Sequence, residues 1–239
     1  MSYFDPLKVK VIALSGGVGG AKLVLGLSKI MQPGELLVVT NTGDDFDHYG
    51  LRICPDTDTV FYSLAGLADT KRGWGRKTET WNFLGALKQL NGEDWFQLGD
   101  KDLALHMIRT QLLSRGISLS KVTETLSSIM GIKHPLVPVT DDHLRTIVIT
   151  PEGPVPFQNY FVKDQCRARV TGFKFEGAYS ARPNSFLVQT LEKNSLEAII
   201  FCPSNPYVSL DPILSIRELR RLIAENKAPK IGVSPIISG

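Results

Sequence analysis

The amino-acid sequence predicts an α/β protein with a Rossmann-like, mainly parallel sheet, helices on both faces, and a smaller helical and antiparallel subdomain. Three observations carry this prediction. The chain opens with a strand, a glycine turn and a helix at residues 8–30. Short β-branched runs separated by Pro and Gly follow at residues 146–175, and alternating strand and helix patterns return at residues 185–234.

We expect one domain spanning residues 1–239. Its Rossmann-like core comprises about residues 1–65 and 185–239, and the subdomain is inserted between them at about 66–184. The chain stops just after a predicted strand without a closing helix, so we expect that it either ends early or has been shortened at its C-terminus.

The first forty residues predict a parallel core. Residues 8–14 form an apolar run typical of a buried strand, and residues 20–30 carry apolar side chains at helical spacing. A second strand is predicted at 35–40, soon after the turn at Pro33 and Gly34. Two strands joined through a helix are parallel, with a crossover that is nearly always right-handed.

The remaining elements follow from the same patterns. Helices are predicted at residues 57–68, 78–90, 101–113, 118–130, 185–191 and 213–224. Antiparallel strands are predicted at 146–150, 157–162 and 169–175, and buried strands at 196–202 and 230–234.

Composition excludes several classes of protein. The chain is 43% hydrophobic and 21% charged, which is ordinary globular usage. A net charge of +3 without clustered Lys and Arg argues against nucleic acid as a partner. No run approaches the about 20 apolar residues of a membrane span. Its three cysteines show no CxxC spacing, so we expect a reducing, cytoplasmic location.

The glycine-rich turn between the first strand and helix predicts a phosphate site. A strand that runs through such a turn into a helix presents backbone N–H groups to an anion, and Lys22 adds a positive charge. The turn matches neither GxGxxG nor GxxxxGK[ST], and the alternative is a tight turn with close strand–helix packing. The glycines of the turn are Gly16, Gly17, Gly19 and Gly20.

An acidic segment beyond the second strand predicts a metal site. Asn41 follows that strand, and five aspartates then fall within residues 44–58. Clustered carboxylates repel one another unless a cation intervenes, and oxygen ligands beside phosphate are how Mg²⁺ is usually held. We assign Asp45 and Asp58 as catalytic residues and Mg²⁺ ligands. Alternatively, some of these aspartates only cap a helix or face water.

Two further segments are candidate ligand contacts. The aromatic pair Trp95 and Phe96 precedes a helix start with two acids and a base, which suits a flat heterocycle, although both rings are equally consistent with a core position and Asp100 with a helix cap. Ser204 and Asn205 lie between two prolines after a buried strand, where they suit a base, ribose or phosphate; the alternative is an ordinary loop.

Seven motifs recur along nearly the whole chain: LSGGVGGAKL (14–23), NTGDDFDHYGLRICPDTDTV (41–60), GWG (73–75), WFQLGDKDLALHMIRT (95–110), PVTDD (138–142), PSNP (203–206) and VSPI (233–236). In these motifs and in their order, the chain resembles the CofD family, the 2-phospho-L-lactate transferases of coenzyme F-420 biosynthesis.

The resemblance implies transfer from a guanosine diphospho-linked lactate, or its enolpyruvyl equivalent, to the terminal ribityl hydroxyl of the deazaflavin Fo, with release of GMP. It implies Mg²⁺ as the cofactor, and it is compatible with a homodimer. Deazaflavin contacts would fall on Asp58 and on Lys101, where family members more often have arginine; lysine lacks the planar bidentate fork. Family members also extend past the VSPI strand.

Two other functions stay open. A non-catalytic, regulatory nucleotide-sugar-binding protein would share the glycine-rich opening, and it would bind UDP-sugars without responding to a deazaflavin. A dinucleotide-dependent oxidoreductase is disfavoured because GxGxxG is missing and the acidic segment would repel a pyrophosphate in the absence of metal.

Overall fold

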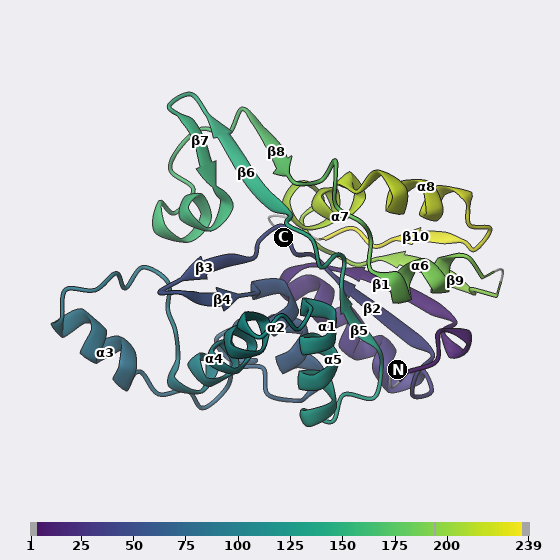
Figure 1. Ribbon diagram of the computed structural model, residues 1–239, viewed down its shortest axis with the longest axis horizontal. Helices are drawn as coiled ribbons and strands as arrows, with labels where there is room; N and C mark the ends of the chain where they lie inside the picture. The colour runs from purple at the N-terminus through teal and green to yellow at the C-terminus, as the bar shows by residue number, and fades with distance from the viewer. Residues whose placement is uncertain (1–3, 194, 236–239) are drawn as a thin grey trace.

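The structure is a computed structural model that describes residues 4–193 and 195–235. Within these ranges, the centre is a five-stranded sheet in the order β10-β9-β1-β2-β5, and every neighbouring pair is parallel (Figure 1). Its strands are Val11–Ser15 (β1), Leu36–Thr40 (β2), Leu136–Pro138 (β5), Ala198–Phe201 (β9) and Lys230–Gly232 (β10). The predicted Rossmann-like sheet is confirmed.

The chain changes direction across the sheet beside β1. It builds β2 and β5 on one side of β1, and later β9 and β10 on the other. The carboxyl ends of β1 and β9 therefore flank a topological switch point, where open α/β sheets bind their ligands. The glycine turn follows β1 and the PSNP loop follows β9, so these two predicted binding segments meet at the switch point.

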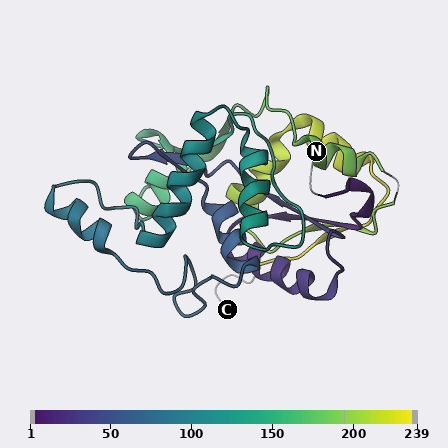
Figure 2. The same ribbon diagram turned by 60° about the horizontal axis from the view of Figure 1, so that its bottom comes forward.

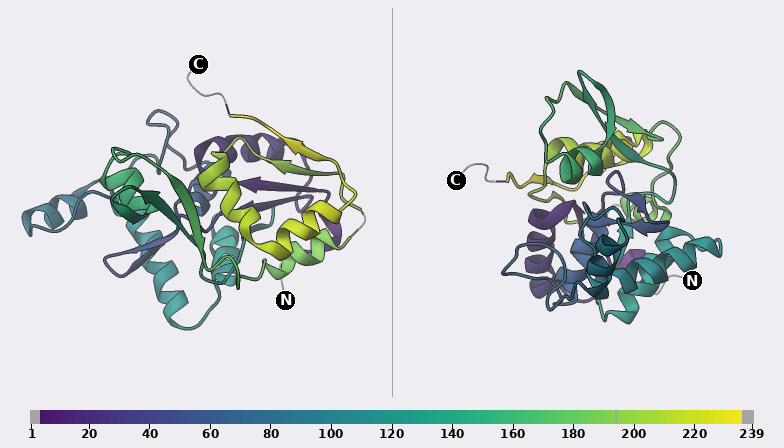
Figure 3. Two further views of the ribbon diagram at one scale, coloured as in Figure 1. Left: turned by 90° about the horizontal axis from the view of Figure 1, so that it is seen from above. Right: turned by 90° about the vertical axis from the view of Figure 1, so that its left-hand side faces the viewer.

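Helices cover both faces of the sheet because side chains alternate along each strand. Ile12 and Leu14 of β1 belong to one buried cluster, and Val11 and Ala13 belong to the other. Figure 3 shows the two helical layers. The first cluster packs against α6 (Ser185–Leu191), α7 (Asp211–Ser215) and α8 (Arg217–Glu225), and the second against α1 (Gly17–Ile30), α2 (Pro55–Leu64), α4 (Asp100–Ser114) and α5 (Leu119–Ile129).

Side-chain caps fix the starts of two helices that pack beside β5. Ser118 accepts a hydrogen bond from the Lys121 N–H at 3.3 Å and begins α5. Asn184 accepts from the Phe186 N–H at 3.0 Å and begins α6.

The smaller elements lie beyond the carboxyl ends of the parallel strands (Figure 1). Figure 2 shows α3 projecting away from the rest of the protein. The antiparallel strands predicted at residues 146–150 and 169–175 are confirmed and pair with each other, whereas the strand at 153–156 was not predicted. These elements are the hairpin β3 (Phe46–His48) and β4 (Leu51–Ile53), helix α3 (Asn82–Gln89), and the antiparallel sheet of β6 (Arg145–Thr150), β7 (Gly153–Pro156) and β8 (Gly172–Glu176).

Two predicted elements are wrong. Residues 157–162 were predicted as a strand but enter a π-helix at Asn159–Lys163, where Phe157 stacks on Phe161 with ring centroids 5.3 Å apart. Apolar residues four positions apart meet on a helical turn, not on a strand. The single helix predicted at 213–224 is broken at Ile216, whose extended backbone lets both α7 and α8 bury side chains in the same core.

The central sheet extends into the segment that was predicted to form the subdomain. Strand β5 falls within the segment 66–184 that the sequence assigns to an inserted subdomain, yet it pairs with β2 in the central sheet. Residues 236–239, which include the end of the VSPI motif and the predicted early end of the chain, lie outside the described residues. Among the described helices, none is long and apolar enough to cross a membrane.

Candidate active site

The glycine turn between β1 and α1 packs tightly against the loop that follows β9. The Ser204 hydroxyl accepts a hydrogen bond from the Gly16 N–H at 3.1 Å and donates to the Gly16 carbonyl at 2.7 Å. A Cβ on Gly19 would lie 2.2 Å from the Pro203 carbonyl oxygen, and Gly17 has a φ of +60°. Glycine is therefore required here by close packing and by the left-handed backbone, as the tight-turn interpretation states.

A carboxylate lies at the N-terminus of α1. Asp56 accepts a hydrogen bond from the Gly17 N–H at 2.6 Å and another from the Asn41 side-chain amide at 3.0 Å. The same amide donates to the Val208 carbonyl at 3.2 Å, and the Asn41 side-chain oxygen accepts from the Gly43 N–H at 2.7 Å. Asp56, one of the five aspartates of the acidic segment, thus joins Asn41 to the glycine turn.

Three buried aspartates at this edge of the sheet resist ionisation. Burial raises the pKa of Asp44 well above its usual value, and the charge of Asp56 adds to this rise. Burial also raises the pKa of Asp45 to about 7 and that of Asp56 to about 6. The charged forms are unfavourable unless a cation or a hydrogen-bond donor compensates them.

Several buried polar atoms at this edge lack hydrogen-bond partners among the described residues: Ser15 Oγ, Thr42 Oγ1, Asp44 Oδ1, Asp45 Oδ1 and Thr146 Oγ1. A buried polar group without a partner costs about 1–3 kcal/mol. Their clustering at the carboxyl end of β1, in the segment that follows β2 and at the start of β6 indicates a region that a polar ligand completes.

Asp45 and Asp58 both contact Cys54. The Cys54 thiol donates to Asp45 Oδ2 at 3.1 Å, and the Asp58 N–H donates to the Cys54 carbonyl at 2.9 Å. The nearby positive charge of Arg145, at the start of β6, opposes the rise in the pKa of Asp45. Arg145 itself donates to the Leu144 carbonyl at 2.6 Å.

Asp58 belongs to a buried network that joins α2 to α4. Both oxygens of Asp58 accept hydrogen bonds from Arg109, one of them at 3.0 Å. His106 lies 3.6 Å from Asp58 through Nδ1 and 3.4 Å from Asp102 through Nε2. The Tyr62 hydroxyl donates to Asp102. Burial opposes the charge of Arg109, but the neighbouring acidic groups, chiefly the Asp58 carboxylate, together raise the pKa of Arg109.

The carboxylates at this site partly fit the predicted Mg²⁺. In the part of the chain that the structure describes, no group of three or more His, Cys, Asp or Glu side chains is arranged to hold a metal ion. Mg²⁺ usually takes only one or two carboxylates and completes its ligands with water and substrate phosphates. Asp45 fits because one of its buried oxygens is unpaired within the described residues, whereas both oxygens of Asp58 bind Arg109.

Three predicted site residues lie outside the group of hydrogen-bonded residues at the glycine turn. Lys22 is exposed on α1. The Asn205 side chain accepts from the Tyr207 N–H at 3.0 Å and caps the turn that follows. Lys101, exposed in the first turn of α4, donates through its ammonium group to the Thr78 hydroxyl at 2.9 Å.

The aromatic pair of the third motif packs against the β3–β4 hairpin. The Phe96 ring meets Phe46 edge-on with centroids 4.9 Å apart, and Trp95 meets His48 at 5.1 Å. Asp100 accepts from the Phe83 N–H at 3.0 Å, so it caps α3 and not its own helix. Both rings pack against other side chains but are only half-buried, and the predicted cap of α4 by Asp100 is wrong because its carboxylate accepts N–H groups of α3 instead.

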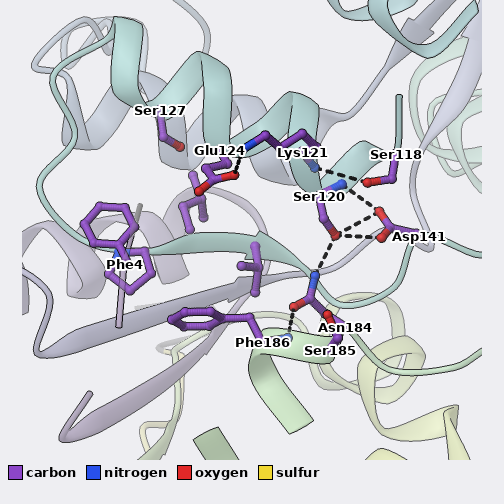
Figure 4. A pocket seen from close by; sticks show the side chains of 13 residues that line it. Phe4, Ser118, Ser120, Lys121, Glu124, Ser127, Asp141, Asn184, Ser185 and Phe186 are labelled. Carbon is purple, nitrogen blue, oxygen red and sulfur yellow. Dashed lines mark hydrogen bonds and ion pairs between the residues drawn. The ribbon is translucent and has the colours of Figure 1, made fainter. Parts of the chain in front are cut away.

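A separate cavity of about 300 Å³ lies between α5 and α6, beside β5. Figure 4 shows Asp141 and Asn184 converging on Ser120 at one end of this cavity, with Phe4 and Phe186 at the other. Ser120 donates through its hydroxyl to Asp141 at 2.8 Å, and Asn184 donates to the Ser120 hydroxyl at 2.6 Å. The PVTDD motif thus ties β5 to two helix starts, away from the glycine turn.

The network on α4 was not predicted, although the sequence carries a signal for it. Asp102, His106 and Arg109 lie at positions i, i+4 and i+7, so they share one face of a helix. Polar residues with this spacing indicate a buried polar stripe when the surrounding positions are apolar. Arg145 had no such signal, because a strand brings it to the site from a distant segment.

The fold and the site define a Rossmann-like protein that presents a glycine turn and buried carboxylates at its switch point. The chain matches the family model described as 2-phospho-L-lactate transferase CofD over residues 11–239. It therefore belongs to the CofD family of transferases.

Curated relatives agree with this membership. The phosphoenolpyruvate transferases of Nocardia farcinica and Kitasatospora aureofaciens are each 40% identical to the chain, covering 96% and 97% of it and 71% and 73% of the relatives. The phosphoenolpyruvate transferase of Mycobacterium tuberculosis is 36% identical, over 96% of this chain and 75% of its own.

Solved structures show the same fold. Protein BH3568 from Bacillus halodurans superposes with a TM-score of 0.65 at 15% identity, covering 94% of this chain and 68% of that one. A second structure of that protein is described as a member of the UPF0052 family. A likeness at this identity shows the fold alone.

Proposed function

We propose that the chain moves a phosphoenolpyruvyl or phospho-lactyl group from a guanosine diphospho-linked donor to the ribityl hydroxyl of the deazaflavin Fo, in coenzyme F-420 biosynthesis. The observation that carries this proposal is the glycine turn at the switch point, beside buried carboxylates that include the unpaired oxygen of Asp45 among the described residues. Family membership and relatives named phosphoenolpyruvate transferase support it.

The proposed reaction breaks and forms one P–O bond. The ribityl hydroxyl oxygen attacks the phosphorus that bears the three-carbon acid, the bond between this phosphorus and the bridging oxygen breaks, and GMP leaves while the hydroxyl loses its proton. Phosphoryl transfer depends mainly on positioning and on neutralising charge. The glycine turn, Lys22, Asn41, Ser204 and Asn205 hold the guanosine diphosphate in this scheme.

Asp45 and Asp58 are the proposed Mg²⁺ ligands. When bound, the ion neutralises the diphosphate and the charge that develops on the leaving group. The buried, unpaired oxygen of Asp45 within the described part supports its role. Asp58 stays a predicted ligand, because in this structure its two oxygens bind Arg109.

The acceptor is proposed to contact Asp58 and Lys101. Both residues belong to one region: Asp58 contacts α4 through Arg109 and His106, and Lys101 lies in the first turn of the same helix. These two assignments rest on the resemblance to the family and not on a contact with a bound molecule.

One assay tests the proposal. The chain is mixed with Fo, Mg²⁺ and either the enolpyruvyl or the lactyl guanosine donor, and the products are read by mass spectrometry. We expect GMP and a deazaflavin phosphodiester that carries the three-carbon acid in at least one arm, and loss of both products with EDTA. Binding of UDP-sugars, with no deazaflavin response in either arm, supports the non-catalytic alternative instead.

A further inference from the structure

The N-terminus of α1 contacts an internal anion. Asp56 Oδ1 lies 2.6 Å from the Gly17 nitrogen, and Asp56 Oδ2 lies 3.0 Å from the Asn41 amide nitrogen. A Cβ on Gly16 would approach Asp56 Oδ2 to 3.0 Å, so the carboxylate lies directly against the turn. Helix N-termini attract anions through their N–H groups and their positive dipole end. Asp56 and a phosphate would therefore compete for the same donors.

Unpaired atoms beside Asp56 indicate that a second molecule belongs here. Ser15 Oγ is fully buried, and Asp44 is 6% exposed. Neither Ser15 Oγ nor Asp44 Oδ1 has a hydrogen-bond partner within residues 4–193 and 195–235. Ser15 Oγ lies 2.4 Å from the position that a Cβ on Gly20 would take, so it faces the glycine turn. The carboxylate of Asp56 alone leaves these polar atoms unsatisfied.

We infer that Asp56 is a positioning residue that holds the glycine turn in the ligand-free protein and exchanges its hydrogen bonds for those of the donor's diphosphate. This inference rests on the proposed function. The incoming phosphate oxygens take the Gly17 N–H and the Asn41 amide, and the negative charge of Asp56 is repelled from them. No covalent bond changes in the exchange.

The structure limits how much has to move. Asp58, two residues further along α2, is held by Arg109 on α4. Helix α2 also packs along α1, through a cluster that includes Val24 and Phe61. The exchange therefore involves the side chain of Asp56, while the backbone of α2 stays anchored through Asp58 and the contacts with α1.

Asp56→Asn separates this role from a purely structural one. The neutral amide still accepts one of the two hydrogen bonds, but it no longer competes as an anion. We expect GDP to bind about tenfold more tightly to Asp56→Asn than to the unsubstituted chain. The reason is that the diphosphate no longer has to displace a charged hydrogen-bond acceptor from the turn. Asp56→Glu keeps the charge, so it should not tighten binding.

The test is calorimetric titration of the full chain with GDP and Mg²⁺. Asp69→Asn is the matched control, because Asp69 also accepts backbone N–H groups, from Lys71 and Arg72 at 3.0 Å, but lies away from the turn. Asp69→Asn should bind GDP like the unsubstituted chain. Should Asp56→Asn fold poorly in a thermal melt, Asp56→Ser provides the same comparison.

The outcomes separate this inference from the proposed function. If the unsubstituted chain binds GDP and Asp56→Asn and Asp56→Ser bind it equally or more weakly, Asp56 only supports the fold and the inference is overturned. If the chain and all variants fail to bind GDP, the proposed function fails and the inference falls with it. Tighter binding confined to Asp56→Asn and Asp56→Ser, with a lower KM for the donor and an unchanged KM for the acceptor, establishes the exchange.

Discussion

Asp58 and Arg109 form a two-point ion pair in the interior of the protein. Arg109 is 1% exposed and Asp58 is 5% exposed, and two guanidinium nitrogens donate to the two carboxylate oxygens. The pair links the first turn of α2 to the middle of α4. It fixes the orientation of a carboxylate that the proposed function places at both the metal and the acceptor.

Removing one partner of this pair should destabilise the fold. Arg109→Met leaves the Asp58 carboxylate buried without its cation, which costs about 3–5 kcal/mol of unfolding free energy. The double variant Asp58→Asn with Arg109→Met should recover a large part of this loss. Urea denaturation measures both, and equal losses in the single and double variants would contradict a direct pairing.

Asp45 should be required for turnover. Asp45→Asn removes the charge that the proposal places beside the diphosphate, so we expect the rate to fall by about 100-fold or more. Asp47→Asn is the matched control, since Asp47 is exposed and pairs with Arg52 on the surface. A near-normal rate in Asp45→Asn, measured by release of GMP, removes Asp45 from the scheme.

Stability should fall as pH rises in the absence of metal. Folding raises the pKa of Asp45 from 3.8 to about 7, so the folded state binds more protons than the unfolded state between these values. The contribution of Asp45 is therefore complete below about pH 4 and is lost as the pH rises through 7. Asp56, with a pKa of about 6, acts in the same direction.

Thermal melts across this pH range, with and without Mg²⁺, measure the effect. Mg²⁺ replaces the protons, so it should stabilise the chain more at pH 8 than at pH 5. Asp45→Asn should make the decline with pH shallower. An identical slope in this variant would show that Asp45 does not titrate as described.

Gly19 should tolerate no side chain. In Gly19→Ala the new Cβ would lie 2.2 Å from the Pro203 carbonyl oxygen, so we expect a loss of about 1–3 kcal/mol of unfolding free energy and weaker GDP binding. Gly26 lies in the same helix with nothing within 4 Å of its Cβ position. Gly26→Ala should therefore stabilise α1 by about 0.5–1 kcal/mol, and a similar loss in both variants would contradict the packing argument.

Lys101 should act on the acceptor and not on the donor. Lys101→Ala removes the charge at the start of α4, and we expect the KM for Fo to rise about tenfold while the KM for the guanosine donor stays the same. Lys101→Arg, which restores the commoner residue of the family, should retain or improve acceptor binding. Steady-state kinetics with each substrate varied in turn distinguishes this from a general loss of structure.

The sequence predicted the parts of the fold that local patterns encode. The apolar runs ending at Ser15 and Thr40, and the glycine turn after the first run, predict the βαβ unit because strand and helix periodicities are local. The predictions for residues 157–162 and for Ile216 were wrong because the backbone conformation there depends on what the side chains pack against. Strand β5 is only three residues long, too short for periodicity to reveal.

For the site, the sequence by itself determined the chemistry available: a glycine turn, an acidic segment and the family motifs that accompany them. Only the tertiary structure decided which aspartate meets which partner. Asp56 lies against Gly17, and Asp58 against Arg109, because α2 packs between α1 and α4 and directs successive acidic side chains to different neighbours. Such contacts join residues about forty to fifty positions apart, so no local pattern specifies them.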